Sequence, residues 1–234
     1  MVTTLTDDVW WVDLQGTNAF LVDDADGTLT LVDAGMPWHA SRLARAIAQV
    51  GSVGDIERVV ITHFDIDHVG GLGKLGGLDA TVYVGAADGP YLRGEERPPW
   101  SRKGLLQRAL DVTRSAPDLP VEPLADGDTV GSFTAYHTPG HTPGHTAFVS
   151  EALSVGLLGD LVVESGGHYE LPAWYLAYDD DEASRSLVGF ADRAPDFEVA
   201  CQGHGTPFLD GGSARVAEAA RREGADEAAP EPGA

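Results

Sequence analysis

Apolar and polar residues alternate through much of the first 85 positions, which is the pattern of β-strands with one buried face. Turn residues separate the alternating stretches, and Asp24–Gly27 is the clearest such turn. Trp10 and Trp11 are adjacent in the first stretch, so they should point to opposite faces of their strand. The predicted strands are Val9–Leu14, Thr17–Asp23, Thr28–Asp33, Ile56–Thr62 and Ala80–Val84.

The period changes to that of a helix over Trp38–Val50, and Gly51 and Gly54 end this helix. Its apolar stripe consists of Leu43, Ala46, Ile47 and Val50. Further strands are predicted at Thr129–His137, Ala147–Val149, Val155–Leu158 and Glu198–Cys201. Further helices are predicted at Asp180–Ala191, capped by Asp179 or Asp180, and at Ala214–Arg222.

The segment from about Gly85 to Pro120 has no clear period and is rich in proline. We interpret it as an irregular insertion that forms a pocket wall, with a helix at Gly104–Thr113. Tyr91, Trp100 and Leu105 are its candidate lining residues, and packing at the surface is the equal alternative for them.

Strand hairpins, a helix, and a second set of strands and helices predict an α/β (α+β) chain with two packed sheets and helices outside. We expect residues 1–222 to form one domain and residues 223–234, which are rich in Ala, Glu, Pro and Gly, to be a disordered tail.

The composition restricts the partners. The net charge is −22, from 37 acidic and 15 basic residues, and this excess favours a high-salt habitat and argues against nucleic acid. No run approaches the roughly 18 apolar residues of a membrane span, and residues 1–8 lack the features of a signal peptide. With Cys201 as the only cysteine, we expect a cytoplasmic protein without membrane partners. A homo-oligomer is possible.

Metal-capable side chains gather directly after the predicted strand Ile56–Thr62. His63, Asp65, Asp67 and His68 lie within six residues, and imidazole with carboxylate suits zinc, iron or manganese. A polar loop with incidental histidine is the plain alternative. Three more candidates follow other strands or turns: His141 after Thr138-Pro139-Gly140, Asp160 after Gly159, and His204 between Gly203 and Gly205.

These motifs, together with Asp33-Ala34-Gly35, resemble the metallo-β-lactamase superfamily in residue type and order. The resemblance implies a four-layer αββα sandwich with one or two metal ions between the sheets. It also implies the ligands: His63, Asp65 and His141 for a first metal, Asp67, His68 and His204 for a second, and Asp160 as a bridge. Asp65 departs from the family, which usually has histidine there. Zinc is the expected metal, with manganese or iron favoured more by Asp65 than by histidine.

Several other side chains have weaker claims. His145 is expected to support a ligand or the substrate, and Cys201 to pack in a strand. His39, His137 and His168 are expected to be structural or exposed. Trp174 and Tyr175 are candidates for a mobile aromatic loop beside the site.

A metal that lowers the pKa of its bound water predicts hydrolysis of a small-molecule ester, lactone or thioester. Asp67 would orient the water and pass a proton to the leaving group. A non-catalytic metal-binding or ligand-sensing protein is the alternative. Glyoxalase II is disfavoured by the short acidic C-terminus, lactonases by the position of Tyr169, and β-lactamases by Asp65. Nucleases are disfavoured by the charge, and flavin-linked enzymes by the missing flavin domain.

Overall fold

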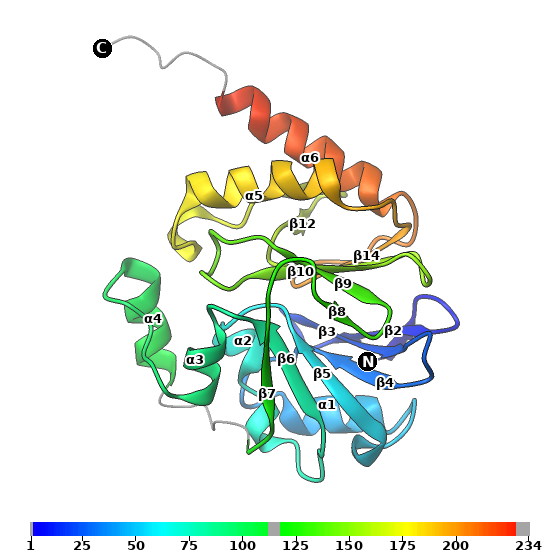
Figure 1. Ribbon diagram of the computed structural model, residues 1–234. Coiled ribbons are helices and arrows are strands. Elements are labelled where there is room, and N and C mark those ends of the chain that lie inside the picture. The colour runs from blue at the N-terminus through cyan, green and yellow to red at the C-terminus, as the bar shows by residue number, and fades with distance from the viewer. Residues whose placement is uncertain (1, 112–117, 228–234) are drawn as a thin grey trace.

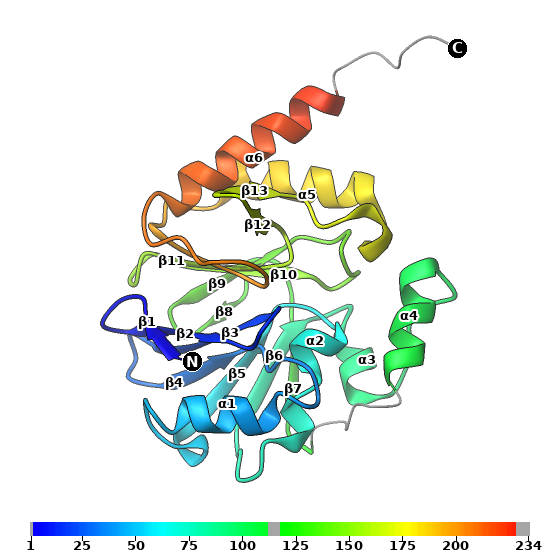
Figure 2. The same ribbon diagram turned by 180° about the vertical axis from the view of Figure 1, so that it is seen from behind.

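Two β-sheets face each other, and helices cover both outer surfaces. The computed structural model describes residues 2–111 and 118–227. In Figure 1, α1 (Ala40–Ile47) lies below the first sheet, α2 (Ile66–Val69) lies beside it on the left, and α5 (Asp180–Arg193) and α6 (Gly212–Glu227) lie above the second. Figure 2 shows the same layers from behind. The expected αββα sandwich is therefore confirmed.

The first sheet has seven strands in sequence order. Its first four strands pair antiparallel and its last three pair parallel to their predecessors, so the carboxyl ends of β4 to β7 lie at one edge. The strands are β1 (Val2–Thr4), β2 (Val9–Asp13), β3 (Asn18–Asp23), β4 (Leu29–Val32), β5 (Ile56–Ile61), β6 (Thr81–Gly85) and β7 (Val121–Leu124).

The second sheet has five strands in the order β14-β11-β10-β9-β8. Its strands are β8 (Thr129–Val130), β9 (Phe133–His137), β10 (Thr146–Ser150), β11 (Val155–Gly159) and β14 (Val199–Gln202). β12 (Val163–Ser165) and β13 (His168–Glu170) form a separate hairpin, which comes between β11 and β14 in the sequence.

Alternation along the strands divides the core into layers. Leu21 and Leu31 pack with Leu43 and Ile47 of α1, while Phe20, which directly precedes Leu21, packs between the two sheets. Likewise Phe148 lies between the sheets, and its neighbours Ala147 and Val149 pack under α5 and α6. Trp10 and Trp11 belong to different layers, as their alternation predicts.

Some predicted elements were wrong in extent. Thr129–His137 is not one strand, because Gly131 has φ 59° and turns the chain between β8 and β9. Helix α6 continues to Glu227, so residues 223–227 are not tail; residues 228–234 lie outside the described part. Strands β1, β7, β12 and β13, each three or four residues long, were missed.

The segment predicted as an irregular insertion is more regular than expected. It contains α3 (Gly89–Arg93) and α4 (Arg102–Asp111), and β7 follows it directly. Helix α4 begins two residues before the predicted start at Gly104, and the predicted end at Thr113 lies outside the described residues. Short 3-10 turns occupy Val53–Asp55, Leu72–Lys74 and Trp174–Leu176, the last labelled η3 here. Among the described residues, no helix is long and apolar enough to cross a membrane.

Candidate metal centre

All seven predicted metal-capable side chains meet where strands of both sheets end. His63 follows β5, Asp65 precedes α2, and Asp67 and His68 lie on α2 itself rather than on a loop. The other sheet brings the remaining three from the ends of β9, β11 and β14: His141, Asp160 and His204. Segments far apart in the sequence thus form one cluster at one edge of the sandwich.

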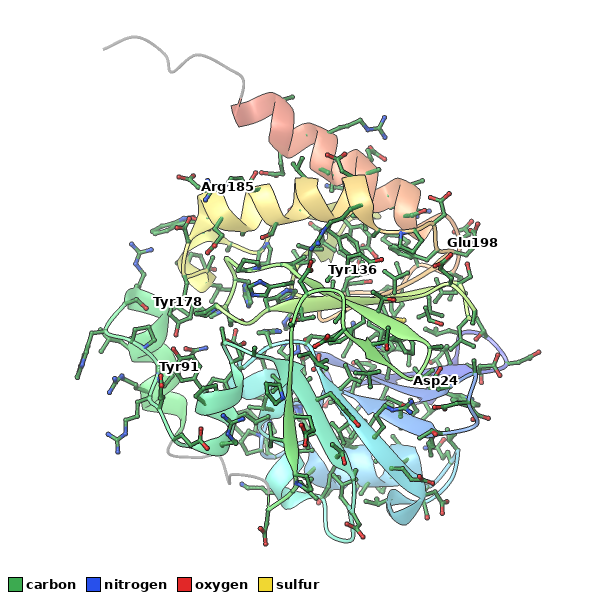
Figure 3. All side chains as sticks on the ribbon, in the orientation of Figure 1. Asp24, Tyr91, Tyr136, Tyr178, Arg185 and Glu198 are labelled. Carbon is green, nitrogen blue, oxygen red and sulfur yellow. The ribbon has the colours of Figure 1, made fainter. Side chains whose placement is uncertain are left out.

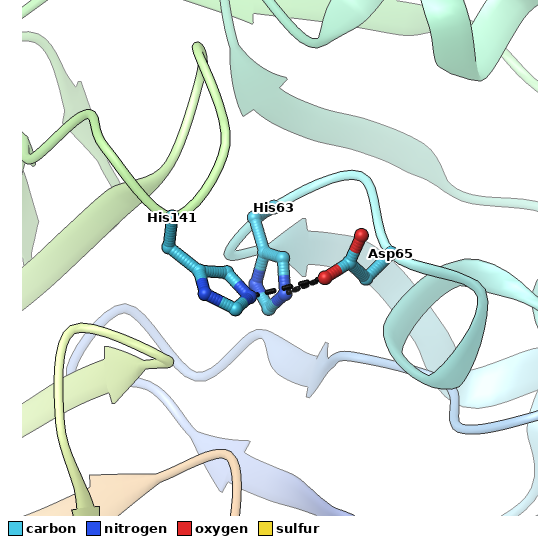
Figure 4. A group of neighbouring side chains, drawn as sticks. All are labelled: His63, Asp65 and His141. Atoms are coloured by element: carbon cyan, nitrogen blue, oxygen red, sulfur yellow. Dashed lines mark hydrogen bonds and ion pairs between the residues drawn. The ribbon is translucent and has the colours of Figure 1, made fainter. Parts of the chain in front are cut away.

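His63, Asp65 and His141 form the first group, shown in Figure 4. Oδ2 of Asp65 lies 3.0 Å from Nε2 of His141 and 3.4 Å from Nε2 of His63. The Asp65 side chain makes no capping bond to α2, although Asp65 is the N-cap residue. Its carboxylate is therefore directed at the two imidazoles.

Asp67, His68 and His204 form the second group. Oδ2 of Asp67 lies 3.5 Å from Nε2 of His204 and 3.9 Å from Nε2 of His68. Asp160 lies between the groups: Oδ2 is 3.4 Å from His141 Nε2 and 3.2 Å from His204 Nε2, and Oδ1 is 3.5 Å from His68 Nε2.

The donor set fits metal ions. Nε2 of His63, Nε2 of His68 and Oδ1 of Asp160 are buried without a hydrogen-bond partner among the described residues, which is costly unless another group satisfies them. Ligand atoms at about 2.0 Å from a tetrahedral ion lie roughly 3.3 Å apart. Most of the separations given above, 3.0 to 3.5 Å, fall close to that spacing.

Hydrogen bonds orient three of the imidazoles. Nδ1 of His68 donates to Asp33 Oδ2 at 2.8 Å, and Nδ1 of His204 donates to the carbonyl of Gly16 at 2.5 Å. Nδ1 of His63 lies 3.0 Å from Thr62 Oγ1, which itself donates to Asp33 Oδ2. Fixing Nδ1 in this way leaves Nε2 of each ring facing the cluster, as metal-binding histidines require.

The electrostatic environment favours cations. Burial disfavours charge on His68, but the carboxylates of Asp160, Asp33 and Asp67 outweigh it and raise its pKa to about 10. Burial is likewise outweighed at His204, where Asp160 raises the pKa to about 9. The negative potential that holds protons on these rings would equally attract a metal ion. At His63, burial and the nearby charge of His68 lower the pKa to about 4.

Two residues of α4, missed in the sequence, hold Asp65 from the other side. Lys103 Nζ lies 2.7 Å from Asp65 Oδ2 and donates to the carbonyl of His141 at 2.9 Å. Gln107 Nε2 donates to Asp65 Oδ1 at 2.6 Å and to the carbonyl of Phe64. One signal was available: Lys103 is one of only two lysines in the chain.

His145 and Gly203 shape the surroundings of Asp160. The buried His145 accepts the backbone N–H of Asp160 at Nε2, 3.0 Å away, while Nδ1 lies 2.8 Å from Thr138 Oγ1. The His145 side chain therefore supports the candidate ligand Asp160 by binding its backbone N–H. A Cβ at Gly203 would lie 2.1 Å from Asp160 Oδ1, so only glycine allows this close approach.

A cavity of about 230 Å³ opens over the cluster. Its walls include Met36, Ile66 and Leu176, with Lys103 and Gln107 at the α4 side. A second cavity of about 220 Å³ adjoins it, because Met36 and Asp67 line both. The cavity side chains are Met36, Asp65, Ile66, Asp67, Lys103, Gln107, His141, Asp160, Leu176 and His204.

The predicted lining residues of the insertion were wrong. Trp100 and Leu105 are exposed at the surface of the α4 segment, and Tyr91 packs against Phe64 and the core under the first sheet. Lys103 and Gln107 line the cavity instead, since they lie on the inward face of α4. On η3, Leu176 lines the cavity, whereas Trp174 and Tyr175 are largely exposed.

The other weaker candidates belong to none of the three groups of metal-capable residues found among the described residues. Cys201 is buried in β14, and burial raises its thiol pKa. Tyr169 is buried and donates to Gln202 Oε1 at 2.9 Å. His168 pairs with Glu170 at the surface, His137 contacts the carbonyl of Pro143, and His39 is partly exposed beside Met36.

Comparison with known proteins agrees with this geometry. The sequence profile of the metallo-β-lactamase superfamily matches residues 12–223. The chain belongs to the metallo-β-lactamase superfamily. Its members are metal-dependent hydrolases, and the fold binds one or two metal ions.

This metallo-β-lactamase-superfamily chain is similar in sequence to three proteins that differ in how much is known of them. It is 28% identical over 221 residues to YobT, an uncharacterised protein of Bacillus subtilis (strain 168), covering 88% of this chain and 89% of YobT. It is 27% identical over 185 residues to an atrochrysone carboxyl ACP thioesterase of Aspergillus fumigatus, covering 76% of this chain and 37% of that protein. A crystal structure of TTHA1623 in a di-iron-bound form is 31% identical, with a TM-score of 0.64, covering 88% of this chain and 96% of that chain.

Proposed function

We propose that this protein hydrolyses a small ester, lactone or thioester at the cluster of His63, Asp65, Asp67, His68, His141, Asp160 and His204. The observation that carries the proposal is the position of this cluster. Seven metal-capable residues converge at one edge of the sandwich, and five of them also face the cavity of about 230 Å³. A metal held there would be accessible to a small molecule and otherwise enclosed by protein.

The metal belongs to the proposal. His63, Asp65 and His141 would hold one ion, Asp67, His68 and His204 a second, and Asp160 lies close to members of both groups. Zinc suits these nitrogen and oxygen donors, and the extra carboxylate at Asp65 makes manganese or iron reasonable. The di-iron form of TTHA1623 supports iron as an alternative. When bound, such a metal supplies a water of lowered pKa and polarises the carbonyl oxygen.

Asp67 is the residue to which we assign proton transfer. Its side chain is 27% exposed, lines both cavities and has Oδ2 close to His204 Nε2. Its backbone carbonyl accepts from Thr17 Oγ1, which helps to fix the residue. A carboxylate in this position can orient an attacking water and then deliver a proton to the leaving oxygen or sulfur.

The cavity suits a compact acyl group. Its apolar walls of Met36, Ile66 and Leu176 would contact a hydrocarbon portion, and the adjoining cavity offers room for a leaving group on the other side of Asp67. Similarity to a protein named as an acyl-carrier-protein thioesterase supports thioesters among the three substrate types.

The experiment compares wild type with Asp67→Asn on a panel of p-nitrophenyl esters, lactones and acyl thioesters, with zinc, manganese or iron loaded. Asparagine keeps an oxygen ligand but removes the proton acceptor, so we expect kcat to fall by roughly 10²–10⁴-fold. Elemental analysis of both proteins separates loss of chemistry from loss of metal.

Asp7→Asn is the matched control, because Asp7 is exposed and takes no part in the cluster. It should keep wild-type rates. Turnover by Asp67→Asn within threefold of wild type would rule out the proton-transfer role. A metal-loaded wild type without turnover on any substrate type would contradict the hydrolase itself.

A further inference from the structure

The carboxylate of Asp65 is held on both oxygens by one face of α4. Oδ2 is 2.7 Å from Lys103 Nζ, and Oδ1 accepts from Gln107 Nε2 at 2.6 Å. Lys103 and Gln107 are four residues apart, so they are neighbours on the same side of the helix. Gln107 is itself fixed, because its Oε1 accepts from the hydroxyl of Tyr178, whose position beside α4 is labelled in Figure 3.

Lys103 is an unusual residue for this chain. Its side chain is only 3% exposed, although lysine is seldom buried without a charged partner. Among the described residues, the ammonium group forms an ion pair with the Asp65 carboxylate and donates to the carbonyl of His141. Both belong to the first group of metal-capable residues, so this lysine is built into the site rather than into the general core.

The ammonium contacts the same oxygen that faces the imidazoles. Oδ2 of Asp65 is 3.0 Å from His141 Nε2 and 3.4 Å from His63 Nε2. A carboxylate oxygen has two lone pairs, so one can accept from Lys103 while the other is directed at a metal. The lysine is then a neighbour of the ion, close enough for its charge to act on the ion directly.

Charge counting shows what the pair does. The superfamily usually has a neutral histidine at the position of Asp65. Aspartate adds one negative charge to the first group, and Lys103 adds one positive charge beside it. Asp65 and Lys103 together are therefore neutral, as a histidine would be.

Resting on the proposed metal site, we infer that Asp65 and Lys103 act as one neutral unit in place of a histidine. Asp65 provides the ligand oxygen. Lys103 is a positioning residue that limits the negative charge of the first group and so sets its affinity for a divalent ion. Gln107 donates to the other carboxylate oxygen, Oδ1, and so fixes the orientation of the Asp65 carboxylate.

The inference predicts an order of affinities from charge alone. Lys103→Met leaves the pair at −1 and should bind Zn²⁺ at the first group at least about tenfold more tightly than wild type. Asp65→His leaves +1 and should bind at least about tenfold more weakly. The double variant Asp65→His/Lys103→Met is neutral again and should return to within about tenfold of wild type.

The measurement is a Zn²⁺ titration of the full chain in competition with a chromophoric chelator, which resolves tight binding steps without any substrate. Carrying the same variants on a His204→Ala background assigns the affected step to the first group, because His204 belongs to the second. Thermal unfolding of each variant shows that it is folded.

Arg102→Met is the matched control on α4. Arg102 is an exposed cation whose guanidinium stacks on Trp174, 4.4 Å from the ring centre, and it has no contact with Asp65 among the interactions of the described residues. It should leave Zn²⁺ affinity within about threefold of wild type, since an exposed charge is screened by water and salt.

The outcomes separate this inference from the proposed function. The order Lys103→Met, then wild type with the double variant, then Asp65→His supports the neutral pair. Equal or weaker zinc binding by folded Lys103→Met overturns it, while leaving the metallohydrolase intact. A wild type that binds no Zn²⁺, Mn²⁺ or Fe²⁺ overturns both.

Discussion

Asp33 adopts a left-handed backbone conformation with φ 57°, which few residues other than glycine and asparagine or aspartate tolerate. The conformation brings its carboxylate under two histidines of the site. Oδ2 accepts from His68 Nδ1 and from Thr62 Oγ1, and that hydroxyl lies next to His63 Nδ1. Oδ1 accepts the backbone N–H of Thr62 at 2.9 Å. One buried carboxylate thus orients a ring in each metal group.

Asp33→Asn should therefore weaken metal binding without touching a ligand. The amide places an NH₂ group where the buried carboxylate accepted hydrogen bonds, so at least one donor loses its partner. We expect Zn²⁺ affinity to fall by roughly 10–100-fold and the free energy of unfolding to fall by about 2–3 kcal/mol. Zinc titration and denaturant unfolding measure the two effects.

Asp23→Asn is the control for that change, because Asp23 is an exposed carboxylate on the neighbouring strand β3. It should leave both quantities close to wild type. If Asp33→Asn keeps wild-type zinc affinity, the orientation of His63 and His68 does not depend on Asp33.

Residue types explain what the sequence revealed of the site. The seven metal-capable residues are histidines and aspartates in short motifs, so the superfamily resemblance identified each of them by position, and the structure brings them together. Lys103 and Gln107 come from a segment without such a motif, and their role depends on where α4 packs. No pattern of neighbouring residues predicts a contact between positions 65 and 103.

Loops from different sheets are joined at the site by Asp88, which lies just before α3. Its buried carboxylate accepts from the backbone N–H of Phe64 at 2.8 Å, from Thr142 Oγ1 at 2.6 Å and from the backbone N–H of Gly144 at 2.8 Å. Phe64 lies between His63 and Asp65, and Thr142 follows His141. The first metal group therefore depends on this connection between β5 and the turn after β9.

Asp88→Ala should destabilise the fold and loosen the first group. It leaves two backbone N–H groups buried without partners, so we expect a loss of about 3–5 kcal/mol in the free energy of unfolding. Thr142→Val is the graded control, since it removes one of the three hydrogen bonds with little change of shape, and should cost about 1–2 kcal/mol.

Chemical denaturation at fixed metal concentration measures both variants. A loss for Asp88→Ala no larger than that for Thr142→Val would mean that the loops are held together by packing, and that the carboxylate is not needed.

Elements with a clear period of apolar residues could be predicted from the sequence, and elements without one could not. The stripe of Leu43, Ala46 and Ile47 located α1, and alternation located β3 and β4 to within a residue or two. Strand β7 contains Pro123 and pairs only along one edge, so propensity argues against it although the sheet accepts it. Helix α6 extends past its predicted end at Arg222, and its apolar residues Val216, Ala219 and Ala220 pack in one cluster with residues of α5, a contact the local sequence does not show.

On the scale of the whole molecule, buried and exposed charges behave differently. The Lys103–Asp65 and Arg58–Asp24 pairs are mostly removed from solvent, so salt should affect them little. The net charge of −22 arises largely from carboxylates at the surface, where like charges repel one another in the compact state. We propose that the protein is adapted to high salt, and stability against salt concentration is the property that reflects this.

Raising KCl from about 0.1 M to about 1 M shortens the screening length from roughly 10 Å to roughly 3 Å. Repulsion among the exposed carboxylates should weaken accordingly, and we expect the thermal midpoint to rise by roughly 5–10 °C. Scanning calorimetry at constant zinc measures the thermal midpoint, with sorbitol at equal osmolality as the uncharged control.

A variant with exposed Asp7, Asp8, Glu57 and Glu218 changed to their amides changes the net charge from −22 to −18. Its midpoint should rise less steeply with KCl, because fewer like charges remain to be screened, and equal slopes for the two proteins would show that the salt effect does not come from surface repulsion.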